Sequence, residues 1–139
     1  MVKLRKSAHI TGMSYAITKT INIPFADAEA RVREELQKEG FGVLTEIDMQ
    51  ATLKKKLGAD IRPYKILGAC NPPFALKSLQ AEDYIGLMLP CNVLLQQRDN
   101  GTEVSAIDPV ASMMAVKNPA LEATAGEVRD KLKRVIAAL

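Results

Sequence analysis

Apolar and polar residues alternate along five segments of the chain, which predicts five strands with one face turned to a core. These segments are residues 15–23, 41–47, 64–70, 86–97 and 102–107. In the fourth segment apolar residues occupy both alternations, so we expect both of its faces to be at least partly covered. Pro90 lies in the middle of that segment and cannot donate to a strand ladder, which predicts an irregularity there.

Apolar residues at steps of three and four predict two amphipathic helices, one early and one at the end of the chain. Asp27 is expected to cap the first helix, and Gly40 is placed to end it in a left-handed conformation. The last helix opens at Asn118-Pro119, and Gly126 weakens it slightly. The two stripes are Phe25, Ala28, Val32 and Leu36, and Leu121, Ala125, Val128, Leu132, Ile136 and Leu139.

Three shorter helices are predicted where a capping residue precedes an apolar stretch. One follows Asp48, with Met49, Leu53 and Leu57 on its buried side, and the others span residues 73–80 and 110–116. Asp99-Asn100-Gly101 supplies residues that tolerate positive φ and predicts a tight hairpin between the last two strands.

The order of these elements favours an α+β fold over a doubly wound parallel sheet, because strands cluster in the second half and a long helix follows them. A chain of 139 residues is long enough for one domain with its own core. We assign that domain to residues 13–139. Residues 1–12 are expected to be a flexible basic leader or, alternatively, an added strand or an arm that grips a partner subunit.

The charge distribution argues against a nucleic-acid-binding protein. The formal net charge of +3 is carried by Lys3, Arg5 and Lys6 in the leader, and the remaining basic and acidic residues balance. Aromatic residues make up only 4% of the chain, which leaves few side chains for base stacking. Neither a membrane span nor a secretory signal is evident, so we expect a cytoplasmic protein with reduced thiols.

The two cysteines are the candidate functional residues. Cys70 and Cys91 each end or interrupt a predicted strand, and each is followed by an asparagine, Asn71 or Asn92. A helix that begins at Asn71-Pro72 would favour the thiolate of Cys70 and make it a nucleophile. The alternative is that both cysteines are buried and act as small hydrophobic residues.

Other chemistry finds little support in the residues. The single histidine, His9, lies in the leader, so Cys-His pairs, Ser-His-Asp triads and ordinary zinc sites lack a member. Glycine-rich phosphate loops are absent. We therefore expect no metal and no cofactor, although a soft metal bound by Cys70 and Cys91, or by four thiols across a dimer axis, stays an alternative. Met113 and Met114 are expected in the core or in a dimer contact.

The stretches Leu-Gly-Ala-Cys-Asn-Pro at residues 67–72 and Leu-Pro-Cys-Asn-Val at residues 89–93, with Asp108-Pro109 and Asn118-Pro119, resemble the family called domain of unknown function 302. The resemblance covers about residues 13–139. It implies a TATA-binding-protein-like β-α-β4-α domain with a curved antiparallel sheet packed on the last helix. It also implies a homodimer, and it matches motif positions at Cys70, Asn71, Pro90, Cys91 and Asn92.

Three functions are compatible with these observations. The first is a homodimeric small-ligand or thiol-sensing binding module whose site is Cys70, Asn71, Pro90, Cys91 and Asn92. The second is a thiol- or persulfide-transfer enzyme with Cys70 as nucleophile and Cys91 as resolving partner. The third is a protein–protein assembly subunit that uses Met113 and Met114. All site hypotheses require that the two sulfurs meet on adjoining strands.

Overall fold

The computed structural model describes Val2 and residues 15–139, and it contains one five-stranded antiparallel sheet. The strand order across the sheet is β1-β5-β4-β3-β2, so β4 is central. The predicted leader, apart from Val2, lies outside the described residues. The α+β prediction is confirmed. The strands are β1 (Ala16–Ile21), β2 (Gly42–Asp48), β3 (Tyr64–Cys70), β4 (Cys91–Arg98) and β5 (Gly101–Ile107).

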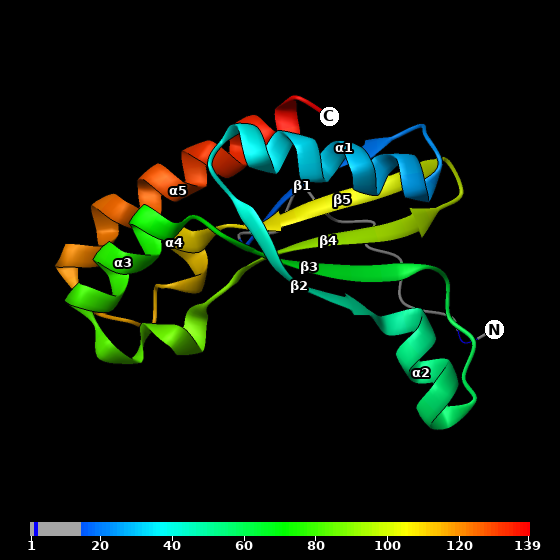
Figure 1. Ribbon diagram of the computed structural model, residues 1–139, viewed down its shortest axis with the longest axis horizontal. Coiled ribbons are helices and arrows are strands. Elements are labelled where there is room, and N and C mark those ends of the chain that lie inside the picture. Colours follow the sequence, from blue (N-terminus) through cyan, green and yellow to red (C-terminus); the bar gives the residue numbers. More distant parts are fainter. Residues whose placement is uncertain (1, 3–14) are drawn as a thin grey trace.

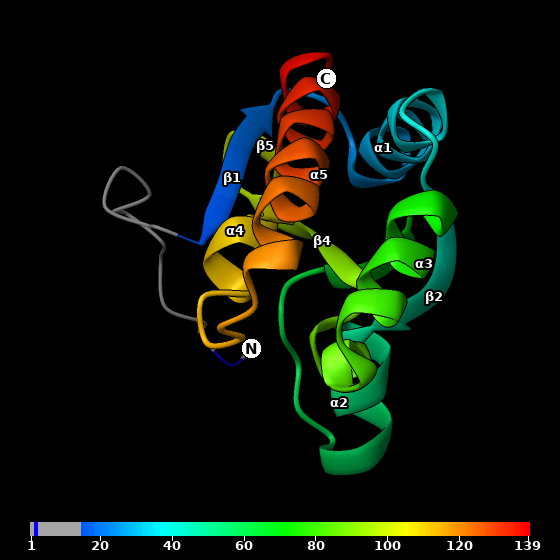
Figure 2. The same cartoon turned by 90° about the vertical axis from the view of Figure 1, so that its left-hand side faces the viewer.

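Two helices, α1 (Phe25–Lys38) and α5 (Pro119–Ala137), pack on the same face of the sheet (Figure 1, Figure 2). Their buried residues match the predicted stripes except that Phe25 and Leu139 are only partly buried, and Val135 is added in α5. Each helix therefore turns its apolar side to the sheet, as its periodicity requires. The strands supply the other half of the core through Ile21, Leu67, Ala69, Cys91, Val93, Leu95, Val104 and Ala106.

The short helices lie at opposite ends of the sheet (Figure 1). Helix α2 (Met49–Leu57) projects beyond one end, whereas α3 (Pro72–Ala81) and α4 (Pro109–Ser112) lie at the other end beside α5. A 3₁₀ helix, η2 (Asp83–Met88), follows α3. The connection between β3 and β4 therefore consists of α3 and η2.

Most predicted helix ends are confirmed. The carboxylate oxygen of Asp48 accepts from the backbone N–H of Ala51 at 2.9 Å, and Asp108 and Asn118 cap α4 and α5 in the same way. Gly40, with φ of 84°, follows α1 in the left-handed conformation. The prediction for Asp27 was wrong, because α1 already begins at Phe25 after Pro24 and Asp27 lies in its first turn.

Three further predictions differ from the structure. The helix predicted over residues 110–116 is only α4, which ends at Ser112. Residues 86–88 belong to η2, and β4 begins only at Cys91. Pro90 therefore precedes the strand, where a missing N–H breaks no ladder hydrogen bond. Helix α2 has no fully buried residue. Met49 and Leu53 on its predicted buried side are half-buried, whereas Leu57 is 75% exposed, so the prediction was wrong for Leu57.

Two lysines on the helix-covered face of the sheet attach the helices to it. The Lys65 ammonium lies 2.8 Å from a Glu29 oxygen on α1 and 2.9 Å from a Glu46 oxygen on β2, and these hydrogen bonds raise the pKa of Lys65. Lys19 donates to the backbone oxygens of Ala137 and Leu139 at 3.2 and 2.7 Å. Lys19, the one polar residue on the apolar side of β1, thus satisfies carbonyls at the end of α5.

Two glycine substitutions should change stability in opposite directions. Gly101 has φ of 132°, and an added Cβ would meet the Ile21 carbonyl oxygen and lie 2.9 Å from the Asn22 Cα. Gly101→Ala should therefore lower the free energy of unfolding by more than about 1 kcal/mol. Gly126 lies inside α5, and an added Cβ there would have no atom within 4 Å. Gly126→Ala should therefore raise the free energy of unfolding by about 1 kcal/mol.

Urea denaturation followed by circular dichroism measures both changes. Equal stabilities of the two variants would contradict the backbone geometry assigned to the β4–β5 turn.

Candidate functional site

The antiparallel pairing of β3 and β4 brings the two cysteines to one end of the sheet. Cys70 is the last residue of β3, Cys91 is the first residue of β4, and Ala69 pairs with Cys91. The chain leaves the sheet after Cys70 as α3 and η2 and returns at Cys91. Since antiparallel partners lie opposite one another, both ends of this long connection are neighbours.

Both cysteines line a single cavity of about 350 Å³ at this end of the sheet, which we call the thiol pocket. The pocket lies between the strand ends, α3 and the segment from α4 to α5. Most of its wall is apolar, with Thr45, Asn71, Ser78 and Thr124 as the polar members. The other side chains are Phe41, Leu44, Ala69, Phe74, Ala75, Leu79, Leu89, Pro90, Pro109, Met113, Ala125 and Val128.

The two thiols differ in exposure. Cys91 is 8% exposed and belongs to the core, whereas Cys70 is partly exposed. Burial raises the pKa of the Cys91 thiol to about 11, and the neighbouring Cys70 contributes in the same direction. Cys91 is therefore a neutral thiol at pH 7 and presents an uncharged wall to the pocket.

Asn71 holds the turn between β3 and α3. Its side chain is buried, and its Nδ2 donates to the backbone oxygen of Glu39 at 3.1 Å. It makes no side-chain cap for α3, so the predicted capping role was wrong. The hydrogen bond ties the pocket wall to the end of α1, because Glu39 directly follows that helix. Asn71 thus organises the backbone of this turn.

Pro90 lines the pocket immediately before β4, after a cis peptide bond from Leu89. Gly68 on β3 makes room for it: an added Cβ would lie 2.8 Å from the Pro90 Cγ and would also meet the Thr45 hydroxyl. A larger residue at Gly68 would displace this part of the wall.

Asn92 lies away from the thiol pocket. It follows Cys91 on β4, and successive side chains on a strand point to opposite faces. Asn92 is exposed and lines a second cavity on the other face of the sheet. The structure thus brings Cys70, Asn71, Pro90 and Cys91 together and separates Asn92 from them.

Residues of α3 outside the two Cys-Asn motifs complete the pocket. Phe74 and Ser78 are one helical turn apart, and the Ser78 hydroxyl donates to the Phe74 carbonyl at 2.8 Å. Ser78 is 4% exposed. Its place on the apolar side of a short helix was the available signal, since the spacing puts both residues on one face. Lys77 and Lys131 hold their ammonium groups 5.4 and 5.9 Å from the Phe74 ring centre.

In the part of the chain that the structure describes, no three His, Cys, Asp or Glu residues form a group able to hold a metal ion. Over the same residues, no helix is long and apolar enough to cross a membrane.

Comparison with known proteins gives the family. Residues 17–139 match the family described as Domain of unknown function DUF302. The chain belongs to this family. The crystal structure of an uncharacterized conserved DUF302 protein from Bacillus stearothermophilus is similar to this DUF302 chain, with a TM-score of 0.84 and 27% sequence identity. The match covers 90% of this chain and 98% of that protein. No curated protein matches the chain.

The two thiols of this DUF302 protein should differ strongly in reactivity. At pH 8 a thiol with a pKa of about 11 is only about 0.1% ionised, and alkylation proceeds through the thiolate. Iodoacetamide should therefore modify Cys70 first, and the rate at Cys91 should rise about tenfold per pH unit from pH 8 to pH 10. Peptide mass spectrometry of timed, quenched samples measures both rates.

Alkylation in urea is the control, because unfolding exposes both thiols and should make their rates similar. Faster modification of Cys91 than of Cys70 in the folded protein would contradict the burial assigned to Cys91.

Proposed function

We propose that this DUF302 protein is a binding module for a small apolar molecule and that the thiol pocket is its site. The observation that carries the proposal is the cavity of about 350 Å³ between the strand ends and α3, which both cysteines line. Cavities of a few hundred Å³ with apolar walls and few polar groups are typical of small-molecule sites.

The chemistry of the wall favours an uncharged ligand. Among the residues that the structure describes, no charged side chain lines the pocket, and Cys91 is protonated at pH 7. An isolated ion would lose its hydration in this cavity without gaining a partner. The side chains of Thr45, Ser78 and Thr124 offer a ligand only a few polar contacts, so shape and apolar contact would dominate binding.

The position of Cys70 supports a role in thiol sensing. This thiol is partly exposed in the pocket wall, so a bound molecule would cover it. A ligand would then control access of alkylating or oxidising agents to Cys70. A cytoplasmic location, where thiols stay reduced, suits this role.

A thiol- or persulfide-transfer enzyme is the second candidate, with Cys70 as nucleophile and Cys91 as resolving partner. It is favoured by the position of Cys70 two residues before the first residue of α3, at the positive end of the helix dipole, and by the second thiol in the same pocket. The neutral, buried state of Cys91 weighs against it. Fast alkylation of Cys70 below pH 7 would favour the enzyme over the binding module.

Filling the pocket should abolish binding of an apolar molecule. We expect N-phenyl-1-naphthylamine, an uncharged fluorescent probe, to bind the protein and to slow alkylation of Cys70. Ala75 lines the pocket from α3, so Ala75→Leu should weaken probe binding about tenfold or more by occupying its space. Fluorescence titration measures the affinity, and mass spectrometry measures the protection of Cys70.

The matched control is Gln80→Leu, which adds the same side chain to an exposed position of α3 outside the pocket. It should leave affinity and protection unchanged. Thermal unfolding by circular dichroism checks that both variants fold. Equal binding by Ala75→Leu and the unchanged protein would overturn the assignment of the pocket.

We further propose that the working form is a homodimer that buries the apolar residues at the α3 end of the molecule. These residues form the end patch: Leu76, Leu79, Tyr84, Leu87 and Met114, each at least 47% exposed. They belong to α3, η2 and the segment after α4, at the same end of the sheet (Figure 1). Asn118 links these segments, because its Nδ2 donates to the Ala81 oxygen at 2.8 Å. A second copy would cover this exposed apolar surface.

Charges in the end patch should break the dimer without unfolding the chain. Leu87 and Met114 are 83% and 75% exposed, so Leu87→Glu and Met114→Glu remove little packing within one chain. We expect each to shift the mass in sedimentation equilibrium from dimer towards monomer. Lys133→Glu, at an exposed position of α5, is the control. Unchanged dimerisation of both end-patch variants would refute this interface.

A further inference from the structure

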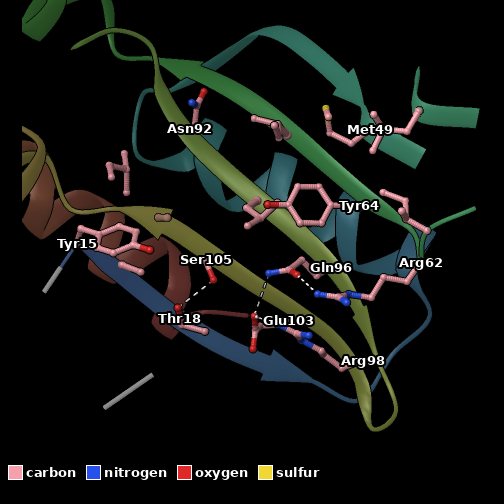
Figure 3. Close-up of a pocket in the computed structure, with 17 residues that line it drawn as sticks. Tyr15, Thr18, Met49, Arg62, Tyr64, Asn92, Gln96, Arg98, Glu103 and Ser105 are labelled. Atoms are coloured by element: carbon pink, nitrogen blue, oxygen red, sulfur yellow. Dashed lines mark hydrogen bonds and ion pairs between the residues drawn. The ribbon is translucent and has the colours of Figure 1, made fainter. Parts of the chain in front are cut away.

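The face of the sheet opposite α1 and α5 carries a second cavity, of about 590 Å³, which we call the open-face pocket. It extends over β1, β5, β4 and β3 and is bordered by α2 and the segment before β3 (Figure 3). Asn92 lines it, whereas neither cysteine does. It is thus separate from the thiol pocket.

One end of the open-face pocket holds a chain of polar side chains. Arg62 Nη2 donates to Gln96 Oε1 at 2.6 Å, and Gln96 Nε2 donates to Glu103 Oε1 at 3.2 Å. Arg98 Nη2 donates to the same Glu103 oxygen at 3.1 Å. Strand pairing sets this arrangement, because Gln96 and Glu103 are direct partners on β4 and β5. Figure 3 shows these four side chains together, with Tyr15 and Asn92 further along the cavity.

This polar end has an excess of positive charge. Of the lining residues that the structure describes, Arg62, Arg98 and Glu103 are charged, so two guanidinium groups face one carboxylate. Glu103 and Gln96 are 5% and 7% exposed, where charges are screened less than at the surface. Burial lowers the pKa of Arg62, and the charge of Arg98 lowers it further. An anion placed beside the two arginines would reduce their mutual repulsion.

The rest of the lining is mainly apolar. Met49 and Leu53 line the cavity from α2. The hydroxyls of Thr18 and Ser105 lie 2.9 Å apart and hydrogen-bond to each other, which satisfies part of their polarity without a ligand. The other apolar contacts come from Ile61, Ile66, Leu94 and Ile107. An apolar body would fit along this surface while its charged end reached the arginines.

We propose that the open-face pocket binds a small anionic amphiphile, a carboxylate or phosphate group on an alkyl or aryl body. The anionic group lies beside Arg62 and Arg98, and the apolar body extends over Ile66 and Leu94 towards α2. Arginine suits this role, because its planar group offers paired donors to a carboxylate or phosphate. The site is independent of the thiol pocket and of the function proposed for it.

The test compares three ligands with the same alkyl chain by isothermal titration calorimetry on the full chain. Decanoate and decyl phosphate carry the anionic group, and 1-decanol lacks it. We expect at least one of the two anions to bind about tenfold or more tightly than 1-decanol, a difference of about 1.4 kcal/mol. The better of the two anions identifies the preferred head group.

Two substitutions then test the polar end in opposite directions. Arg62→Gln should weaken binding of the anion about tenfold. Glu103→Gln removes the competing carboxylate and should strengthen binding several-fold. The control, Lys55→Gln on the exposed side of α2, removes a positive charge outside the pocket and should change affinity less than about twofold.

Ala75→Leu, which fills the thiol pocket, should leave binding of the anion unchanged and so separates the two sites. Three results would overturn the proposal: equal affinity for 1-decanol and both anions, equal affinity of Arg62→Gln and the unchanged protein, or no binding of any of the three ligands. A fourth result that would overturn the proposal comes from amide hydrogen exchange measured at several protein concentrations. Concentration-dependent protection of β1 and β5 on the open face would identify that face as an interface between copies of the chain.

Discussion

The packing of α1 and α5 against one face of the sheet is the constraint on which the rest of the molecule depends. The central strand β4 buries Val93 and Leu95 completely on that side, and β3 buries Leu67 and Ala69. An antiparallel sheet needs only one covered face to be stable. The opposite face was therefore free to acquire polar residues and a cavity without loss of the core.

The same constraint explains why the thiol pocket lies at the end of the sheet. The β3–β4 connection runs through α3 and η2 instead of a tight turn, and α3 packs beside α5 at that end (Figure 2). Ladder pairing holds Cys70 and Cys91 together whatever path residues 71–90 take. The pocket is the space that this long connection encloses against the strand ends. Its walls thus come from both local motifs and distant helices.

Periodicity predicted the elements that make one core, because each has a single buried side. The stripes of α1 and α5 and the NG hairpin between β4 and β5 follow from local residue types. The 3₁₀ helix at residues 86–88 could not be predicted from local residue types, because a short apolar run is equally typical of a strand and of a buried turn. The sequence placed Asn71 in a turn, but it could not predict the hydrogen bond from Asn71 to the Glu39 backbone oxygen, because Glu39 comes close only in the folded chain.

The candidate site was predictable to the extent that it depends on adjacent strands. Two cysteines at the facing ends of β3 and β4 had to meet once the strands paired. The strict alternation of a strand also shows why Asn92 cannot accompany Cys91, although the motif places them together. The residues of α3 and the polar end of the open-face pocket required knowledge of packing and register. Gln96 meets Glu103 only through the β4–β5 register.

The two pockets share the β3–β4 ladder but use different residue pairs of it, and Cys70 reaches the thiol pocket from the end of β3. Ala69 and Cys91 form a pair that contributes to the thiol pocket, while Ile66 and Leu94 form a pair that lines the open-face pocket. A slip of one residue in this ladder would move each set to the other face. The burial of Leu67, Val93 and Leu95 prevents such a slip, because it would bring polar residues into the core. The hydrophobic packing that defines the fold therefore also keeps the neutral thiol wall and the arginine-containing cavity on separate faces.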